Sequence, residues 1–241
     1  VECETIHFAK LDEVEPLVHS IDNPVQVDSS LPRLFSSNDQ LYMSWVEKTD
    51  SLSKLIFSIY EQATWTKPQE VVSGTDWFVN WADFPAIAQN NGNILTSFLQ
   101  KSASGTYTYD VKLNLYNAAA KTWKKNFILH DDGTQSEHGF ITIKPYVDNS
   151  FFVTWLDGRE TVGKGHGGGQ MMLRGAIVFE DGSVQYDTLL DDRTCDCCQT
   201  SITMTQDGPI IVYRDRSKHE IRDIYFSQKI DSVWSTPKPV F

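Results

Sequence analysis

The segment that decides the fold is residues 31–72, LPRLFSSNDQLYMSWVEKTDSLSKLIFSIYEQATWTKPQEVV. Apolar and polar residues alternate in four short runs, at 31–35, 41–46, 55–60 and 65–72, and polar turns such as Ser37-Asn38-Asp39 separate them. Period-two alternation between turn residues is typical of strands joined as hairpins. The segment therefore predicts a four-stranded antiparallel sheet.

The same pattern returns three times, at about residues 83–130, 139–191 and 198–241. The best internal match pairs Trp65-Thr-Lys-Pro-Gln-Glu-Val with Trp234-Ser-Thr-Pro-Lys-Pro-Val. Four-strand units that recur roughly every 50–60 residues are typical of the blades of a β-propeller. We expect an all-β propeller with four blades, and a β-sandwich with irregular hairpins is the alternative.

The chain divides into an N-terminal strand and connector at 1–28 and a propeller at 29–241. The sequence ends directly after the last strand of a blade, at Phe241. Complete rings usually need more than four blades, so we expect about four blades of a six-bladed protein. The start, Val-Glu-Cys-Glu, suggests a processed chain or a fragment.

Composition limits the classes of partner. The net charge of -11 argues against nucleic acid and against an anionic membrane surface, since both would repel the chain. No apolar run approaches the roughly 18 residues of a membrane-spanning helix. The hydrophobic content of 40% is enough for a full-sized core.

Blade topology separates tight turns from long loops. In a meander of antiparallel strands, alternate connections lie at opposite ends of the sheet. One end should carry short turns such as Asn38-Asp39 and Asp148-Asn149. The other end should collect the long polar loops at 77–83, 135–138, 157–170, 191–199 and 214–223. Binding or catalysis is expected at that second end.

The repeats resemble the sialidase-like superfamily of six-bladed propellers with bacterial neuraminidase (Asp-box) repeats, over about residues 28–241. The resemblance is carried by the Trp-x-x-Pro endings at Trp65 and Trp234, the turn Asp231-Ser232-Val233-Trp234, and the phrases Trp155-Leu-Asp-Gly-Arg159 and Tyr213-Arg-Asp-Arg216. It implies a secreted, periplasmic or cell-surface bacterial protein of the kind often labelled exo-α-sialidase.

The same resemblance implies a site in which three arginines hold a sugar carboxylate, beside a Tyr/Glu nucleophile pair and an Asp acid/base. The first of these arginines stands in an Arg-Ile-Pro phrase, where this chain has Ser30-Leu31-Pro32. The equivalent phrase of the second repeat is Asp83-Phe84-Pro85. The nucleophilic Tyr and the last arginine would fall beyond Phe241.

The long-loop end is rich in opposite charges. Its candidate catalytic carboxylates are Asp157, Glu160, Asp215 and Glu220, and its candidate ligand-binding groups are Arg159, Arg193, Arg214, Arg216 and Arg222, with Trp77 and Trp81 as a sugar-stacking platform. The alternative is that Arg and Asp or Glu neutralise one another in a salt-bridge network between blades, and that the tryptophans pack internally.

The third candidate is the segment Cys195-Asp196-Cys197-Cys198. Thiolates together with His138 and His166 suit Cu or Zn, which are soft or borderline metals. A strained local disulfide, pairing with Cys3, or free thiols are the alternatives.

These observations predict a propeller that binds a glycan, a glycoconjugate or another anionic ligand, with glycoside hydrolysis as the candidate activity. The competing prediction is a non-catalytic propeller that binds a protein partner in a surface assembly.

Overall fold

The computed structural model describes residues 19–25, 27–164 and 168–241, and these are organised almost entirely as β-strands. The one helical element among them is a short 3-10 helix, η1 (Arg159–Thr161). None of the described helical structure is long and apolar enough to cross a membrane. The strand expected near residues 4–9 lies outside the described residues, and residues 19–25 contain no strand.

The strands form four antiparallel sheets in chain order. The first sheet contains β1 (Ser29–Ser37), β2 (Gln40–Thr49), β3 (Leu52–Glu61), β4 (Thr64–Trp65) and β5 (Gln69–Gly74). The second contains β6 (Ile87–Asn90), β7 (Asn93–Lys101), β8 (Tyr109–Asn117) and β9 (Thr122–Ile128). The third contains β10 (His138–Pro145), β11 (Phe151–Asp157), β12 (Met171–Val178) and β13 (Val184–Thr194). The fourth contains β14 (Ser201–Met204), β15 (Pro209–Arg214), β16 (Ile224–Ile230), β17 (Val233–Trp234) and β18 (Lys238–Pro239).

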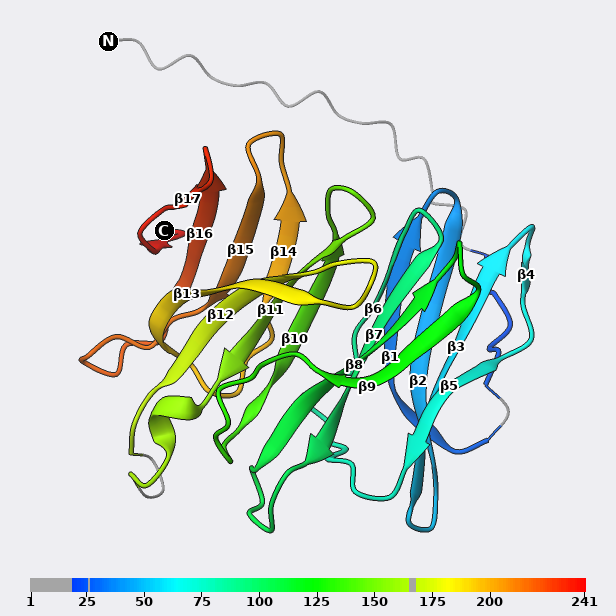
Figure 1. Cartoon of the computed structure of the whole chain (residues 1–241), viewed down its shortest axis with the longest axis horizontal. Helices are drawn as coiled ribbons and strands as arrows, with labels where there is room; N and C mark the ends of the chain where they lie inside the picture. The colour runs from blue at the N-terminus through cyan, green and yellow to red at the C-terminus, as the bar shows by residue number, and fades with distance from the viewer. Residues whose placement is uncertain (1–18, 26, 165–167) are drawn as a thin grey trace.

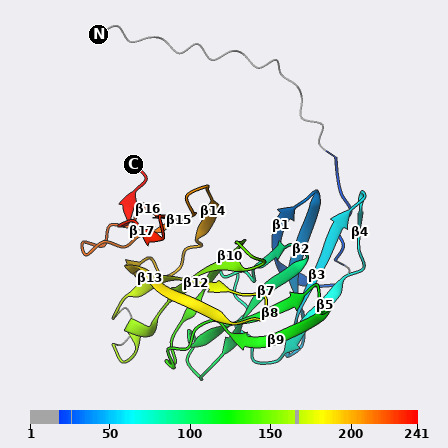
Figure 2. The same ribbon diagram turned by 45° about the horizontal axis from the view of Figure 1, so that its top comes forward.

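The four sheets follow one another like the blades of a propeller. They run from the blue first sheet to the red fourth sheet across Figure 1, and Figure 2 shows them fanning along an arc. The first strands of consecutive sheets are in contact: β1 with β6, β6 with β10, and β10 with β14. The predicted propeller of four-stranded antiparallel blades is therefore confirmed, and the β-sandwich alternative is excluded.

The fourth strand of the first and last sheets is interrupted, although the sequence pattern predicts it as one run. β4 and β5 are separated around Pro68, and β17 and β18 around Pro237. Proline has no N–H to donate to the ladder, so the strand pauses there.

The repeated tryptophan motif makes the same hydrogen bonds in both places. Thr66 follows Trp65, and its N donates to Ile59 O at 2.8 Å while its Oγ1 accepts from Ile59 N at 3.0 Å. Ser235 follows Trp234 and makes the equivalent bonds to Gln228 at 2.8 and 3.1 Å. A hydroxyl at this position therefore replaces part of the ladder that the interruption removes.

The short turns lie at the end opposite the long loops. Asn38 and Asp39 both have positive φ, 48° and 61°, and so do Asp148 and Asn149, 50° and 61°. Two consecutive left-handed residues make the type I′ turn that matches the twist of a hairpin, and Asn and Asp tolerate this conformation. The predicted tight turns thus have a local physical basis.

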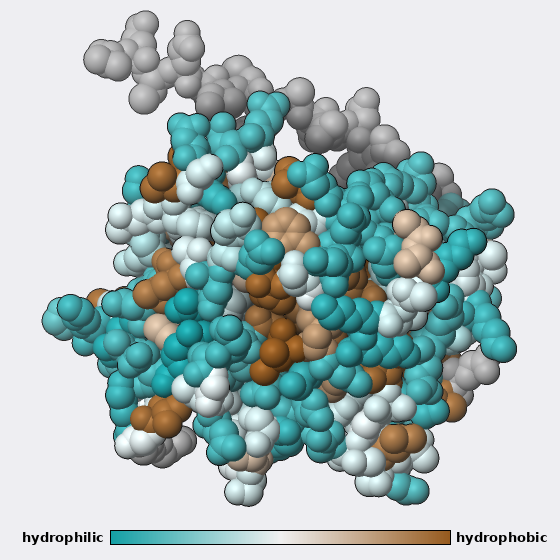
Figure 3. Space-filling model, in the orientation of Figure 1, coloured by the Kyte–Doolittle hydropathy of each residue, from teal (hydrophilic) through white to brown (hydrophobic). Residues whose placement is uncertain are grey.

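The core lies between neighbouring sheets. Its largest cluster joins the second and third sheets and includes Leu113, Ile141, Phe151 and Trp155. In Figure 3 the surface is largely hydrophilic, with hydrophobic surface gathered toward the middle of the view. Burial of apolar side chains between the sheets, at about 25 cal/mol per Å², is what holds them together.

Candidate functional site

The described parts of six loops make up what we name the loop face: residues 75–86, 102–108, 129–137, 158–164 with 168–170, 195–200 and 215–223. Neighbouring loops touch through specific bonds. Tyr109 and Glu137 form a parallel bridge, Thr194 and Asp215 an antiparallel one, and Gln199 Nε2 donates to Ala82 O at 2.7 Å. These contacts hold the ends of different sheets in one fixed surface.

Glu137 lies directly before β10, where it meets the second sheet. The hydroxyl of Tyr109, at the start of β8, donates a 2.7 Å hydrogen bond to Glu137 Oε1. The backbone N of Tyr109 also donates to Ser136 O at 3.1 Å. Glu137 is partly exposed, whereas Tyr109 is buried. The carboxylate is therefore held from behind and reaches the surface.

Asp83 lies beside this pair and is buried, with 2% of its surface exposed. Its Oδ2 accepts a 2.8 Å hydrogen bond from Phe140 N, and its Oδ1 has no partner among the described residues. A Cβ on Gly139 would overlap Asp83 Oδ2 and would lie 3.1 Å from the Tyr109 ring. Glycine at position 139 is therefore what allows Asp83 and Tyr109 to approach β10 so closely.

Both carboxyl groups have a pKa near neutrality. Burial raises the pKa of Asp83 to about 7, although the hydrogen bond from Phe140 N lowers it. The charge of Glu137 adds to the rise. Burial also raises the pKa of Glu137 to about 7, although the hydrogen bond from Tyr109 lowers it. The charge of Asp196 raises the pKa of Glu137 further. Two such groups in one place are typical of acid–base sites.

Asp157 and Arg159 satisfy each other. Asp157, at the end of β11, is fully buried, and Arg159 donates to it from Nε at 2.8 Å and from Nη2 at 2.7 Å. Trp155 Nε1 donates a further bond at 2.9 Å. Burial would raise the pKa of Asp157, but the bonds from Arg159 outweigh it and hold that pKa below its usual value. The structure thus places this predicted acid and this predicted arginine in an ion pair in which the carboxylate is fully buried and the guanidinium is partly exposed.

His138 belongs to the same buried cluster. Its Nε2 lies 3.3 Å from Asp132 Oδ1 and 3.7 Å from Asp157 Oδ1. His130 Nδ1 lies 2.7 Å from Asp132 Oδ1, and the two imidazole rings stack with centroids 3.6 Å apart. Burial, and then the neighbouring His138, lower the pKa of His130. The structure therefore groups His138 with carboxylates and not with the cysteines, and His166 lies outside the described residues.

Three of the predicted ligand-binding arginines converge on the predicted catalytic Glu220. They are Arg193 at 3.0 Å, Arg216 at 2.9 Å and Arg222 at 3.4 Å, each measured from a guanidinium nitrogen to a Glu220 carboxylate oxygen. The Arg193 pair joins the end of β13 to the loop after β15. This arrangement corresponds to the salt-bridge alternative, since it occupies these charges with one another.

Two other predicted acids have separate surroundings. Glu160 is exposed in η1 and lies 3.2 Å from Lys164 Nζ. Asp215 is nearly buried, and burial followed by the charge of Asp191 raises its pKa. The structure does not bring either of them into the group formed by Glu137 and Asp83.

The two tryptophans of the loop before β6 differ in exposure. Trp77 stacks on Phe98 with ring centroids 4.2 Å apart and packs against the first and second sheets. Trp81 is 85% exposed. Trp77 is thus part of the packing, and Trp81 alone offers a free aromatic face to a ligand.

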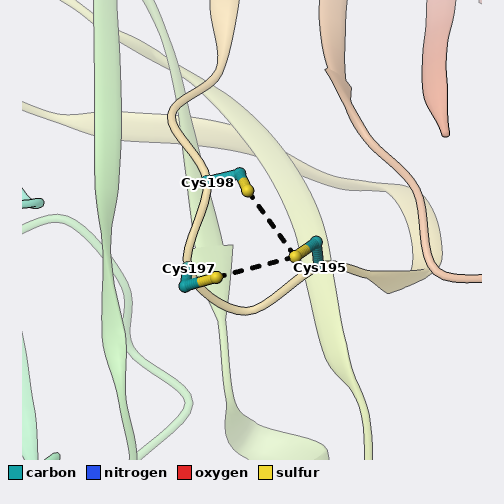
Figure 4. Close-up of side chains that lie close together, drawn as sticks. All are labelled: Cys195, Cys197 and Cys198. Atoms are coloured by element: carbon teal, nitrogen blue, oxygen red, sulfur yellow. Dashed lines mark hydrogen bonds between the residues drawn. The ribbon is translucent and has the colours of Figure 1, made fainter. Parts of the chain in front are cut away.

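Cys195, Cys197 and Cys198 gather their sulfurs at one point between β13 and β14 (Figure 4). The sulfur of Cys195 lies 3.7 Å from that of Cys197 and 3.6 Å from that of Cys198. A disulfide needs about 2.05 Å. The three are therefore free thiols, and the expected disulfide is not supported within the described residues. The remaining partner considered, Cys3, lies outside them.

The thiols have unequal acidity. Burial disfavours the Cys195 thiolate, but the backbone N–H of Cys197 and the thiols of Cys198 and Cys197 stabilise it, so its pKa is lowered. Burial and the neighbouring Cys195 raise the pKa of Cys197. Of Cys195 and Cys197, Cys195 thus loses its proton more readily.

Two hollows of the described surface lie elsewhere. One, of about 380 Å³, is lined by residues 21–24, 60 and 63–68 at the edge of the first sheet. The other, of about 470 Å³, surrounds the turn between β1 and β2 and includes Tyr60. Neither is lined by a residue of the loop face, so these hollows carry none of the predicted site residues.

Sequence reasoning misses Glu137, Asp83 and Tyr109 as site residues. The signal in the sequence that could have found them is their position in the repeated four-strand pattern. Glu137 directly precedes the first strand of the third sheet, and Asp83 lies in the loop that leads to the first strand of the second sheet. The first strands of consecutive sheets are in contact, so side chains at their starts lie close to the neighbouring sheet.

No family model matches the chain, and no curated protein sequence matches it significantly. Solved structures do resemble it. An endo-arabinase from Bacteroides thetaiotaomicron has a TM-score of 0.54 at 10% identity, over 91% of this chain and 82% of that one. A thermostable family-43 glycoside hydrolase has a TM-score of 0.51 at 10% identity, over 92% and 77%. A GH43_1 enzyme from Xanthomonas citri, complexed with xylose, has a TM-score of 0.51 at 10% identity, over 89% and 75%. These similarities support the propeller fold, and they add no support for the sialidase-type repeat assignment.

Proposed function

We propose that this chain is a carbohydrate-active propeller that binds a glycan on its loop face and hydrolyses a glycosidic bond, with Glu137 as the general acid. The observation that carries the proposal is the state of Glu137. It is partly exposed, has a pKa of about 7, and is held by the hydroxyl of Tyr109.

A general acid for glycoside cleavage must be protonated near neutral pH and must reach the oxygen of the leaving group. The raised pKa of Glu137 meets the first condition, and its partial exposure leaves the carboxyl group open to a ligand on the loop face. The buried Asp83 is too enclosed to touch a substrate, with 2% of its surface exposed. We assign it a positioning role, because it fixes the start of β10 through Phe140 N.

Glycoside hydrolysis also needs a second carboxylate, as nucleophile or as base. The best placed is Asp196, which is exposed and whose charge raises the pKa of Glu137. Two carboxyl groups with different environments, one partly buried and one exposed, are the usual way to separate acid and base roles at one pH.

The loop face favours a neutral glycan over an acidic one. Arg159 is paired with Asp157, and Arg193, Arg216 and Arg222 are paired with Glu220. A carboxylate clamp of three free arginines is therefore not available among these residues. Trp81 supplies an exposed aromatic surface of the kind on which sugar rings stack. The endo-arabinase and the family-43 hydrolase that resemble this fold support the proposed class of reaction.

The test is hydrolysis of a panel of aryl glycosides, with arabinosides, xylosides and a sialoside among them. Glu137→Gln should lower kcat/KM by about 100- to 10,000-fold without unfolding the protein, since it removes the acid. The comparison is Glu160→Gln, an exposed acid of the same face, which should have little effect.

Three results would contradict the proposal in different ways. Loss of activity in Glu160→Gln but not in Glu137→Gln would move the acid elsewhere. Cleavage of the sialoside alone would restore the sialidase assignment. Complete inactivity of the wild-type chain, with glycan binding retained or absent, would favour a non-catalytic propeller that binds a partner.

A further inference from the structure

The three sulfurs of Cys195, Cys197 and Cys198 are already arranged as metal ligands. All lie within 4.8 Å of one another, and the two contacts to Cys195 measure 3.7 and 3.6 Å. A metal bound to sulfur at about 2.3 Å places neighbouring sulfurs about 3.8–4.0 Å apart. In Figure 4 the sulfurs of Cys197 and Cys198 point toward that of Cys195. Small side-chain movements are enough to receive an ion.

The loop that carries these cysteines is fixed at both ends. At its start, Cys195 N donates to Arg214 O at 2.9 Å, next to the bridge between Thr194 and Asp215. At its end, Thr200 O accepts a 2.8 Å hydrogen bond from Oγ1 of Thr142, which lies in β10 of the third sheet. A site whose ligands are held in place before binding loses little conformational entropy when the ion arrives.

A positive charge lies beside the cluster. Arg214 Nη1 lies 3.7 Å from Cys198 Sγ, and no carboxylate of the described residues lies within 4.0 Å of Arg214. This arginine differs from its neighbours Arg216 and Arg222, which are paired with Glu220. A free guanidinium offsets the surplus negative charge that three thiolates bring to a monovalent ion.

The donor set selects the kind of metal. Within the described ranges, the sulfur group includes no histidine nitrogen and no carboxylate oxygen. Structural Zn(II) sites use four protein ligands, whereas thiolates without harder donors suit Cu(I). We propose that Cys195, Cys197 and Cys198 bind one Cu(I) ion as three thiolates, with Arg214 as the neighbouring countercharge. Any thiol proton displaced on binding passes to solvent.

The experiment is a titration of the full reduced chain with Cu(I) under anaerobic conditions, against bicinchoninate as a competing chelator. We expect one ion per chain. X-ray absorption should show three sulfurs at about 2.3 Å and no nitrogen ligand.

The variants make the site specific. Cys195→Ser removes the sulfur shared by both contacts and should weaken binding by more than about 100-fold. Arg214→Ala should weaken it by about 10- to 100-fold, as a group next to the ligands. Cys3→Ser is the matched control, because it removes a thiol outside this segment, and it should bind like wild type.

The proposal is overturned by a stoichiometry near zero, by unchanged binding in Cys195→Ser, or by loss of binding in Cys3→Ser. A nitrogen ligand with preference for Zn(II) would also overturn it. So would an oxidised cluster that resists reduction until the protein unfolds. Binding is read directly, so the outcome is separate from the proposed hydrolysis, and Glu137→Gln should still bind the ion.

Discussion

The hydroxyl of Tyr109 donates a 2.7 Å hydrogen bond to Glu137 across the boundary between the second and third sheets. One residue comes from the start of β8, and the other lies directly before β10. Their side chains meet only because the two sheets pack against each other. The bond therefore links the integrity of the fold to the acidity of the group that we assign to catalysis.

Replacing Tyr109 with Phe should raise the pKa of Glu137, because the hydrogen bond from Tyr109 opposes the effect of burial. It should also reduce the free energy of unfolding by about 1 kcal/mol, the usual contribution of such a bond. Carbon-detected NMR titration and urea unfolding measure the two effects. Tyr107→Phe, which changes an exposed ring in the preceding loop, is the control. An unchanged Glu137 titration would show that the bond has no influence on acidity.

Asp83 should make the protein less stable as the pH rises from about 4 to 7. Its pKa rises from an ordinary 3.8 to about 7 on folding, so the folded state binds more protons in this window. Each such group costs at most about 1.4 kcal/mol per pH unit there.

Asp83 and Glu137 both lose their extra proton over this pH range, so both lower the stability as the pH rises. Asp83→Asn should therefore remove about half of the fall in stability that the two groups cause together. Urea unfolding at several pH values measures it. Asp207→Asn, in an exposed turn of the fourth sheet, should leave the slope unchanged. A wild-type protein whose stability rises steadily between pH 4 and 7 would contradict the raised pKa values.

Gly139→Ala should destabilise the chain by about 1–3 kcal/mol, because the new methyl group overlaps Asp83 Oδ2 and crowds the Tyr109 ring. The cost should be smaller in an Asp83→Ala background, where space has been opened. A double-mutant cycle by thermal or urea unfolding measures this coupling, expected to exceed about 0.5 kcal/mol. Strictly additive effects would mean that the two side chains do not share this space.

Arg159→Met should destabilise the chain by about 3 kcal/mol at neutral pH, since it leaves the fully buried Asp157 unpaired. The pKa of Asp157 is lowered on folding, so its contribution is present above its unfolded pKa and is lost as the pH falls through the folded value. The cost of Arg159→Met should accordingly shrink in acid.

The variant Asp157→Asn combined with Arg159→Met should recover part of the loss, because it removes the unpaired charge. Chemical unfolding at pH 7 and pH 3 distinguishes these cases. Equal destabilisation at both values would argue that lost packing, and not the charge, is responsible.

Glu220→Gln should leave the melting temperature nearly unchanged, although Glu220 contacts three arginines. The network is exposed to solvent, where ion pairs are screened and contribute little. Differential scanning fluorimetry at low and high salt checks this. A large loss of stability that disappears in salt would show that the network holds the third and fourth sheets together.

Much of the fold could be predicted from local sequence. Period-two alternation located the sheets, and Asn38-Asp39 and Asp148-Asn149 located their turns, because strand and turn preferences depend on neighbouring residues. The loop face followed from antiparallel topology. Residue pairing did not follow, since Arg159 next to Asp157 and Arg216 near Glu220 look identical to free ligand-binding charges in a sequence.

The sequence by itself determined that the chain forms four antiparallel sheets in series and that its unusual chemistry lies at one end. Both depend on patterns within a few residues. Only the tertiary structure decided that Glu137 meets Tyr109, that His138 joins Asp132 and not the cysteines, and that three sulfurs share one point. These contacts join residues from different loops and sheets, or depend on the exact path of one loop, and burial between sheets sets their pKa values.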